Sequence, residues 1–116
     1  MAQRVRHLFF AALAVSSLAG EAALAADTLV TIGAPAEGAK LAAGKPSKVE
    51  YEVQAGTKAH HVHLFVDGGE VGTAHKLKGS FELPALKAGG HKICVAPVNT
   101  NHTPIGEKAC ISVTAE

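Results

Sequence analysis

Residues 48–54, Lys-Val-Glu-Tyr-Glu-Val-Gln, alternate between apolar and polar side chains, and residues 61–67, His-Val-His-Leu-Phe-Val-Asp, do the same in their first half. Successive side chains of a β-strand point to opposite faces, so this alternation predicts two strands with one buried face each. The buried face carries Val and Tyr in the first stretch and Val and Leu in the second. The two stretches therefore favour a layered β-structure over a helical one.

The rest of the chain after residue 27 repeats this pattern of short runs that end at Gly or Pro. No long stretch carries apolar residues at helical spacing. We predict about seven short strands spaced roughly ten residues apart, which is typical of an all-β antiparallel sandwich. A small open barrel of the same strands is the alternative. The further expected strands are 28–32, 79–83, 92–98 and 108–114, with short edge pairings near 40–42 and 70–73 and hairpin turns at Gly68-Gly69 and Gly89-Gly90.

The first 25 residues have the three parts of a secretory signal peptide. Arg4 and Arg6 form a basic start, an apolar run of about 13 residues follows, and Ala23-Leu24-Ala25 supplies the small residues that a signal peptidase requires. A membrane-spanning helix needs about 20 apolar residues, so an uncleaved anchor is the weaker alternative. We therefore expect a signal peptide over 1–25 and one domain over 26–116. That domain is predicted to be periplasmic or secreted, with no membrane span after signal cleavage.

The composition excludes several classes of partner. The chain has 116 residues and a formal net charge of +1, which suits one domain but not a nucleic-acid binder, whose affinity comes from neutralising phosphates. Only 4% of the residues are aromatic and none is Trp, so stacking surfaces for bases or sugars are not expected. Without residues 1–25, nine Lys balance nine acidic residues and no Arg remains. Bidentate recognition of phosphate by Arg is therefore excluded for the mature chain.

The chain has two cysteines, Cys94 and Cys110, which lie in the last two expected strands. An even pair of cysteines in an exported domain predicts a disulfide. If the two strands form a hairpin, the cysteines face each other on its outer surface. A pair of metal-binding thiolates is the alternative, which an oxidising compartment disfavours.

The densest chemistry in the sequence is His60-His61-Val62-His63. On a strand, residues i and i+2 project from the same face, so His61 and His63 stand side by side while Val62 points into the core. Two imidazoles in this arrangement can chelate one metal ion, and imidazole suits copper and zinc. His60, at the start of the strand, is a candidate third ligand. A plain polar strand face without a ligand is the alternative.

His102 is expected to join this group. In an immunoglobulin-like strand order, the loop between the last two strands lies at the end of the sandwich where the His61 strand begins. That loop contains His102, which makes His60, His61, His63 and His102 the predicted metal ligands. His91 is expected at the opposite end, near Asp67. The sequence gives no reason to group His75 with the four ligands.

Several motifs resemble those of small exported bacterial immunoglobulin-like domains. They are similar to a domain-of-unknown-function family that is marked by a His-His-His-Leu-x-x-Asp strand followed by a Gly-x-His strand. The present chain has Val62 where that family has the middle His. The resemblance covers about residues 28–115 and implies a periplasmic β-sandwich with no established activity. The matching motifs are Ala34-Pro35-x-x-Gly38, His60-His61-x-His63-Leu64-x-x-Asp67-Gly68, Leu86-x-x-Gly89-Gly90-His91 and His102-x-Pro104.

These observations predict a periplasmic protein that binds copper or zinc through a histidine cluster. The alternative is a non-catalytic immunoglobulin-like module that contacts another envelope protein and holds no metal. For that alternative, Phe65, Pro97 and Val98 are the candidates for an exposed apolar patch. An enzyme is not expected, because no set of base, nucleophile and orienting group can be assembled from the sequence.

Overall fold

The computed structural model describes residues 29–116, so the predicted signal peptide and the predicted start of the domain at residue 26 lie outside the described part. Residues 29–116 form strands and connections without a helix. No helix in this described part is long and apolar enough to cross a membrane. The strands are β1 (Val30–Ala34), β2 (Lys40–Leu41), β3 (Ser47–Val53), β4 (His61–Val66), β5 (Gly69–Ala74), β6 (Lys78–Leu83), β7 (Gly89–Val98) and β8 (Ala109–Ala115).

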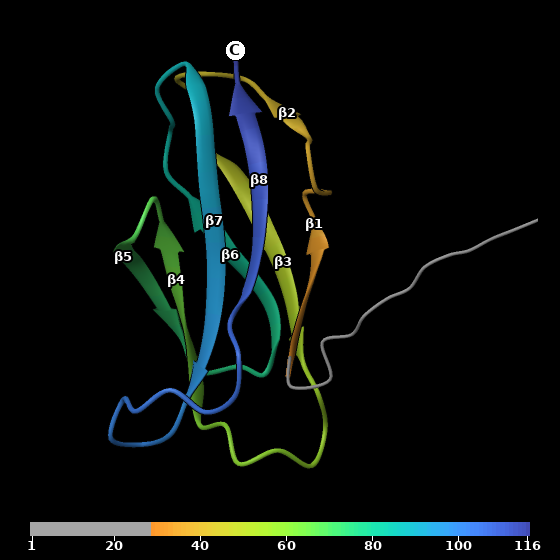
Figure 1. The fold of residues 1–116 in the computed structure, drawn as a ribbon, viewed down its shortest axis with the longest axis vertical. Helices are drawn as coiled ribbons and strands as arrows, with labels where there is room; N and C mark the ends of the chain where they lie inside the picture. The colour runs from red at the N-terminus through yellow and green to blue at the C-terminus, as the bar shows by residue number, and fades with distance from the viewer. Residues whose placement is uncertain (1–28) are drawn as a thin grey trace, which may run out of the picture.

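The strands form two sheets that face each other (Figure 1). The smaller sheet has the order β1-β3-β6 and is antiparallel throughout. The larger has the order β2-β8-β7-β4-β5, and only the short β2 pairs in parallel, with β8. This arrangement confirms the predicted all-β sandwich, with one strand more than the seven or so expected.

The core lies between the sheets and is built from the inward side chains of the alternating stretches. Along β3, Val49, Tyr51 and Val53 are buried while the residues between them are exposed. Val62 and Leu64 of β4 meet them from the other sheet and are fully buried. The predicted inner faces of these strands are therefore confirmed. Fully burying one such aliphatic side chain contributes about 1.5–3 kcal/mol.

β4 and β5 form a hairpin whose two central turn residues are Asp67 and Gly68. Both have positive φ, 52° and 88°, as a type I′ turn requires, and Asp-Gly is a preferred pair for this turn. The predicted turn at Gly68-Gly69 is therefore displaced by one residue, since Gly69 already pairs with Val66. The β5 register shifts between Gly72 and Glu70, which leaves Val71 as a bulge residue.

β7 is longer than the sequence predicts. Gly89 and Gly90 pair with Ala115 and Thr114 of β8, so they are strand residues, and the hairpin turn predicted there is wrong. Gly89 has φ 127°, which only Gly adopts at low cost, and this explains why a Gly pair that resembles a turn begins a strand. The extension makes β7 the longest strand, with 10 residues.

Cys94 of β7 and Cys110 of β8 are register partners and form a disulfide, with their Cα atoms 4.1 Å apart. The predicted disulfide and its position on the last hairpin are confirmed. The two sulfurs are bonded to each other, so the alternative of a thiolate metal site is wrong for this oxidised form.

Candidate metal centre

Five histidines gather at the end of the larger sheet where β4 begins and β7 ends: His60, His61, His63, His75 and His102. His61 and His63 belong to the first half of β4. The loop that joins β7 to β8 lies at the same end of the sandwich as the start of β4 (Figure 1). An isolated bridge between Val98 and Pro104 closes the base of this loop. The loop places His102 over the two strand histidines, as the immunoglobulin-like strand order predicts.

The loop changes the environment expected for the strand histidines. An outer strand face is normally wet, but His61 is only 1% exposed and His63 only 8% exposed. His102 remains exposed above them. The site is therefore a buried pair of imidazoles covered by a third, with solvent access from the loop side.

Three ring nitrogens of the site form a nearly equilateral triangle. Nε2 of His61 lies 3.1 Å from Nε2 of His63 and 3.2 Å from Nδ1 of His102, and the remaining side, from His63 to His102, is 3.1 Å. An imidazole nitrogen carries either a proton or one in-plane lone pair. Three such atoms cannot make three mutual hydrogen bonds, so one side of the triangle always brings two protons or two lone pairs together.

A metal ion resolves this conflict, because it accepts all three lone pairs at once. Nitrogens about 2.0–2.1 Å from a common ion are about 3.3 Å apart at tetrahedral angles and about 2.9 Å apart at right angles. The observed sides of 3.1–3.2 Å lie between these limits. The triangle therefore fits three ligands on one face of a zinc or copper ion, with the opposite face open.

The Nδ1 atoms of His61 and His63 have partners that favour the tautomer with a free Nε2 lone pair. Nδ1 of His63 lies 3.2 Å from a carboxylate oxygen of Glu70, and Nδ1 of His61 hydrogen-bonds Nδ1 of His60 over 2.9 Å. A proton on each Nδ1 leaves Nε2 free for metal, and a carboxylate on the far side raises the basicity of the ligand. Glu70 was not predicted from the sequence, because the β5 bulge and not chain proximity brings it to His63.

A tight loop holds His102 in place. Its backbone N–H donates to the carbonyl of Asn99, and the Asn99 side chain accepts from the backbone N–H groups of Asn101 and Thr103. These bonds keep His102 at φ 65°, a left-handed conformation that costs an L-residue about 1–2 kcal/mol. A residue held in this way at a candidate site points to a role for its side chain.

The arrangement of the cluster differs from the expected group of four in two respects. His60 hydrogen-bonds His61 from outside the triangle, so it is a partner of a ligand and not a fourth member of the triangle. His75, which was not expected in the cluster, follows β5 directly and stacks on His61 with ring centroids 4.9 Å apart. The β4–β5 hairpin explains this contact, because it returns the chain to the start of β4.

Burial and the neighbouring imidazoles both favour the neutral form of His61. Burial lowers the pKa of His61 below its usual value, and the imidazoles around it lower this pKa further. Metal coordination requires a neutral imidazole, so the lowered pKa favours binding at neutral pH and below.

His91 lies apart from the cluster, as predicted. Its Nδ1 donates to the Asp67 carboxylate over 2.6 Å, and its Nε2 donates to the carbonyl of Lys87 over 2.7 Å. The bond to Asp67 is the main reason that the pKa of His91 is raised. With both nitrogens bonded to acceptors, His91 ties the β4–β5 turn to β7 and has no lone pair for a metal.

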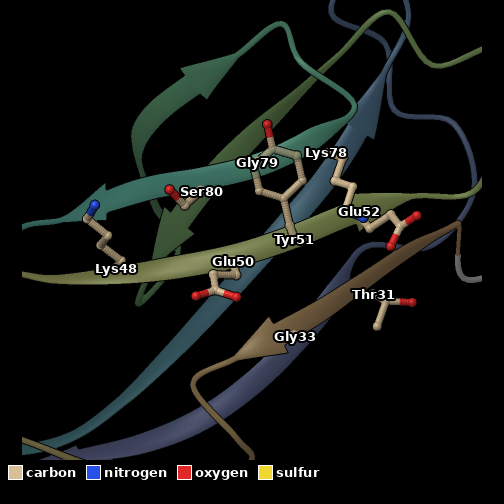
Figure 2. A pocket seen from close by; sticks show the side chains of 9 residues that line it. All are labelled: Thr31, Gly33, Lys48, Glu50, Tyr51, Glu52, Lys78, Gly79 and Ser80. Carbon is tan, nitrogen blue, oxygen red and sulfur yellow. The ribbon is translucent and has the colours of Figure 1, made fainter.

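A separate hollow lies on the outer face of the smaller sheet, on the opposite side of the core from the histidines. Figure 2 shows its lining, where charged side chains of β3 stand beside small residues of β1 and β6. The hollow has a volume of about 440 Å³ and is open to solvent. Its lining residues are Thr31, Gly33, Lys48, Glu50, Tyr51, Glu52, Lys78, Gly79 and Ser80.

No protein-family model matches the sequence, and no curated protein sequence matches it significantly. Solved structures do resemble the fold. The chain is similar to the fibronectin(III)-like modules of Clostridium thermocellum CbhA, with a TM-score of 0.63 and 18% identity over 75% of this chain and 95% of that one. It is also similar to a lytic polysaccharide monooxygenase of Jonesia denitrificans, with a TM-score of 0.52 and 18% identity over 71% of this chain and 60% of the monooxygenase.

These similarities establish the fold and support its predicted immunoglobulin-like character. They do not reach the predicted domain-of-unknown-function family, which stays a prediction from the motifs. Identities of 18% carry no residue roles from either neighbour to this chain.

Proposed function

We propose that this protein binds one copper or zinc ion through Nε2 of His61, Nε2 of His63 and Nδ1 of His102. The observation that carries the proposal is the triangle of three nitrogens, whose sides of 3.1–3.2 Å a shared ion satisfies and hydrogen bonds do not. Glu70 supports the proposal from behind His63. Of the four ligands predicted from the sequence, this proposal keeps three and gives His60 the role of holding His61.

The donor set selects among metals. Three neutral imidazoles suit Cu(II) and Zn(II), and Cu(II) binds more tightly than other divalent ions at such nitrogen ligands. The described cysteines are bonded to each other and leave no thiolate that would favour Cu(I). We propose Cu(II) or Zn(II) with an open face that solvent or an exogenous ligand fills.

The proposed role is binding without catalysis. Once the ion is bound, both nitrogens of His61 and of His63 are engaged, one by the metal and one by its partner, so neither imidazole is free to act as a general base. The proposal therefore concerns capture or carriage of the metal.

We propose further that the protein works in the periplasm or outside the cell. The Cys94–Cys110 disulfide supports this location, because disulfides persist in oxidising compartments. Residues 1–25 would be removed on export, which gives a mature chain that begins at Ala26 or within a residue or two of it. Intact-mass measurement of the protein from an envelope fraction tests this, and a full-length chain in the cytoplasm would contradict it.

Calorimetric titration of the purified exported protein with Cu(II) and with Zn(II) tests the metal site. We expect a tight first equivalent that is lost when His61 and His63 are both replaced by Ala. His91→Gln is the matched control, because it removes a histidine outside the cluster while Gln keeps a hydrogen-bonding side chain. Absence of any tight equivalent at neutral pH in the folded wild-type protein would refute the proposal.

If no metal binds, a non-catalytic module that contacts another envelope protein takes its place. The similarity to a fibronectin(III)-like module, which this chain covers over 95% of its length, favours this second candidate. The apolar patch predicted for it is wrong in part, because Pro97 and Val98 are buried and only Phe65 is partly accessible. Its contact surface would have to use other residues, such as Val71 and Leu77, the large apolar side chains that are exposed among residues 29–116.

A further inference from the structure

A second group of three imidazoles shares His61 with the triangle. His60, His61 and His75 each offer a ring nitrogen, and these atoms all lie within 4.8 Å of one another. The Nδ1 atoms of His60 and His61 are 2.9 Å apart. The centroid of the His75 ring lies 4.9 Å from the centroid of the His61 ring and 5.5 Å from that of the His60 ring. The two groups meet at His61, whose Nε2 belongs to the triangle and whose Nδ1 faces the second group.

We propose that a second Cu(II) or Zn(II) ion binds to Nδ1 of His60, Nδ1 of His61 and a ring nitrogen of His75, so that His61 bridges two metal ions. This inference rests on the proposed function, because the bridge needs the first ion in the triangle. The site takes a divalent ion that accepts imidazole nitrogens.

The geometry of the second group matches the requirement for adjacent ligands. The Nδ1–Nδ1 separation of 2.9 Å equals the spacing of about 2.9 Å that two ligands at right angles take on one zinc or copper ion. Coordination by His75 needs a rotation of its ring, because a ring stacked at 25° on His61 does not direct its in-plane lone pairs at an ion on Nδ1 of His61. The His75 side chain is exposed and is free to make this rotation. The two ions would be about 6 Å apart, one at each nitrogen of the same ring.

The backbone of both outer ligands is anchored near His61. The backbone N–H of His60 donates to the carbonyl of Val98 over 2.8 Å. His75 is followed by Lys76, whose carbonyl accepts a bond of 2.6 Å from the buried Tyr51 hydroxyl. Both ligand side chains are exposed, so an ion can enter from solvent without opening the core.

Filling the second site changes the protonation of His61. With the first ion on Nε2, the neutral ring keeps its proton on Nδ1. The second ion replaces that proton: the Nδ1–H bond breaks, an Nδ1–metal bond forms, and the proton passes to the buffer. The resulting imidazolate carries one negative charge between two dications, which offsets part of their repulsion. The first ion accepts one lone pair from each of its three ligands and breaks no N–H bond.

Two features set the order of filling. The triangle contains the two buried histidines and has the Glu70 carboxylate behind it, whereas two of the three ligands of the second group are exposed. The second group does not contain His63, the histidine that the Glu70 carboxylate contacts. We therefore expect the triangle to fill first and the second site to bind more weakly.

Cu(II) titration of the purified exported protein, followed by electron paramagnetic resonance and calorimetry in buffers of different ionisation enthalpy, tests the inference. We expect two equivalents. The first gives a full paramagnetic signal and releases no proton. The second releases about one proton per ion, and the signal per bound copper falls because two Cu(II) ions joined through an imidazolate couple their spins.

Variants separate this inference from the proposed function. His75→Ala should remove the second equivalent and leave the first, whereas His102→Ala should weaken the first, and His91→Gln should change neither. One equivalent alone, or a second that His75→Ala does not weaken, would overturn the second site and leave the triangle in place. Two equivalents that both keep the full signal and release no proton would overturn the bridge. Loss of the first equivalent from the wild-type protein would overturn both proposals.

Discussion

The carboxylate of Glu70 lies 3.2 Å from Nδ1 of His63, although the two residues belong to different strands and Glu70 is on a sheet edge. The bulge at Val71 turns Glu70 toward β4, and the Thr73 hydroxyl donates to its second oxygen over 3.2 Å. A carboxylate fixed in this way orients the imidazole and increases its basicity, so Glu70 acts on the metal through His63.

Glu70→Gln should therefore weaken metal binding without disturbing the fold. We expect the affinity of the first equivalent to fall by about 10–100-fold, which is typical when a partner of a metal ligand is lost. Glu82→Gln is the matched control, because Glu82 is exposed on β6 in the other sheet. Competition with a chelator of known affinity measures the change, and equal affinities for the Glu70 and Glu82 variants would contradict the role of Glu70.

The positive φ at residue 102 should affect stability, and the His102 side chain should affect metal binding. His102→Asn removes the ligand but places a residue that tolerates positive φ in the turn, so the free energy of unfolding of the metal-free protein should rise by about 1 kcal/mol relative to His102→Ala. Both variants should bind metal more weakly than wild type. Urea unfolding and calorimetry measure the two effects. If Asn and Ala give the same stability, the positive φ of His102 is not a source of strain.

The sequence predicted the faces of the strands well, because a period of two fixes which side chains point inward. Val62 and Leu64 entered the core, and His61 and His63 stood together on the other side, as the alternation requires. The approach of His102 followed from strand order alone. These predictions needed only local geometry and the usual connection of such sandwiches.

The contacts that the sequence missed depend on the exact register of the hairpins. His75 reaches His61 because β5 returns beside β4, and Glu70 reaches His63 because one bulge shifts that pairing. The alternation of side chains does not reveal a bulge. A bulge shifts the pairing of every later residue with the neighbouring strand by one position. The burial of His61 was also missed, because a covering loop hides a strand face that the pattern marks as wet.

Loss of the disulfide should lower stability without unfolding the domain. Cys94 and Cys110 join neighbouring strands that already pair over seven residues, and the core between the sheets does not include the bond. For a loop of this length, the chain-entropy treatment gives a loss of about 3 kcal/mol. Thermal melts with and without reductant should show a lower Tm and an unchanged far-ultraviolet spectrum. Equal Tm values after confirmed reduction would contradict this expectation.

His61 and His91 should affect the stability of the metal-free protein in opposite ways as pH changes. Burial lowers the pKa of His61, so below about pH 6.5 the unfolded chain gains a proton that the folded protein resists. The free energy of unfolding therefore falls as the pH falls. The bond to Asp67 raises the pKa of His91. Its contribution is fully present below about pH 6.5 and is lost as pH rises through the raised value.

His91→Gln should therefore destabilise the metal-free protein more at about pH 5.5 than at about pH 9, because only the protonated ring makes the charged bond to Asp67. His61→Gln should destabilise the metal-free protein less at about pH 5.5 than at about pH 9, since it removes the buried group whose protonation opposes folding at low pH. Urea unfolding of both variants and of wild type at the two pH values, with a chelator present, measures these differences. If His91→Gln lowers the free energy of unfolding by the same amount at both pH values, the charged Asp67–His91 bond does not contribute to stability as its geometry indicates.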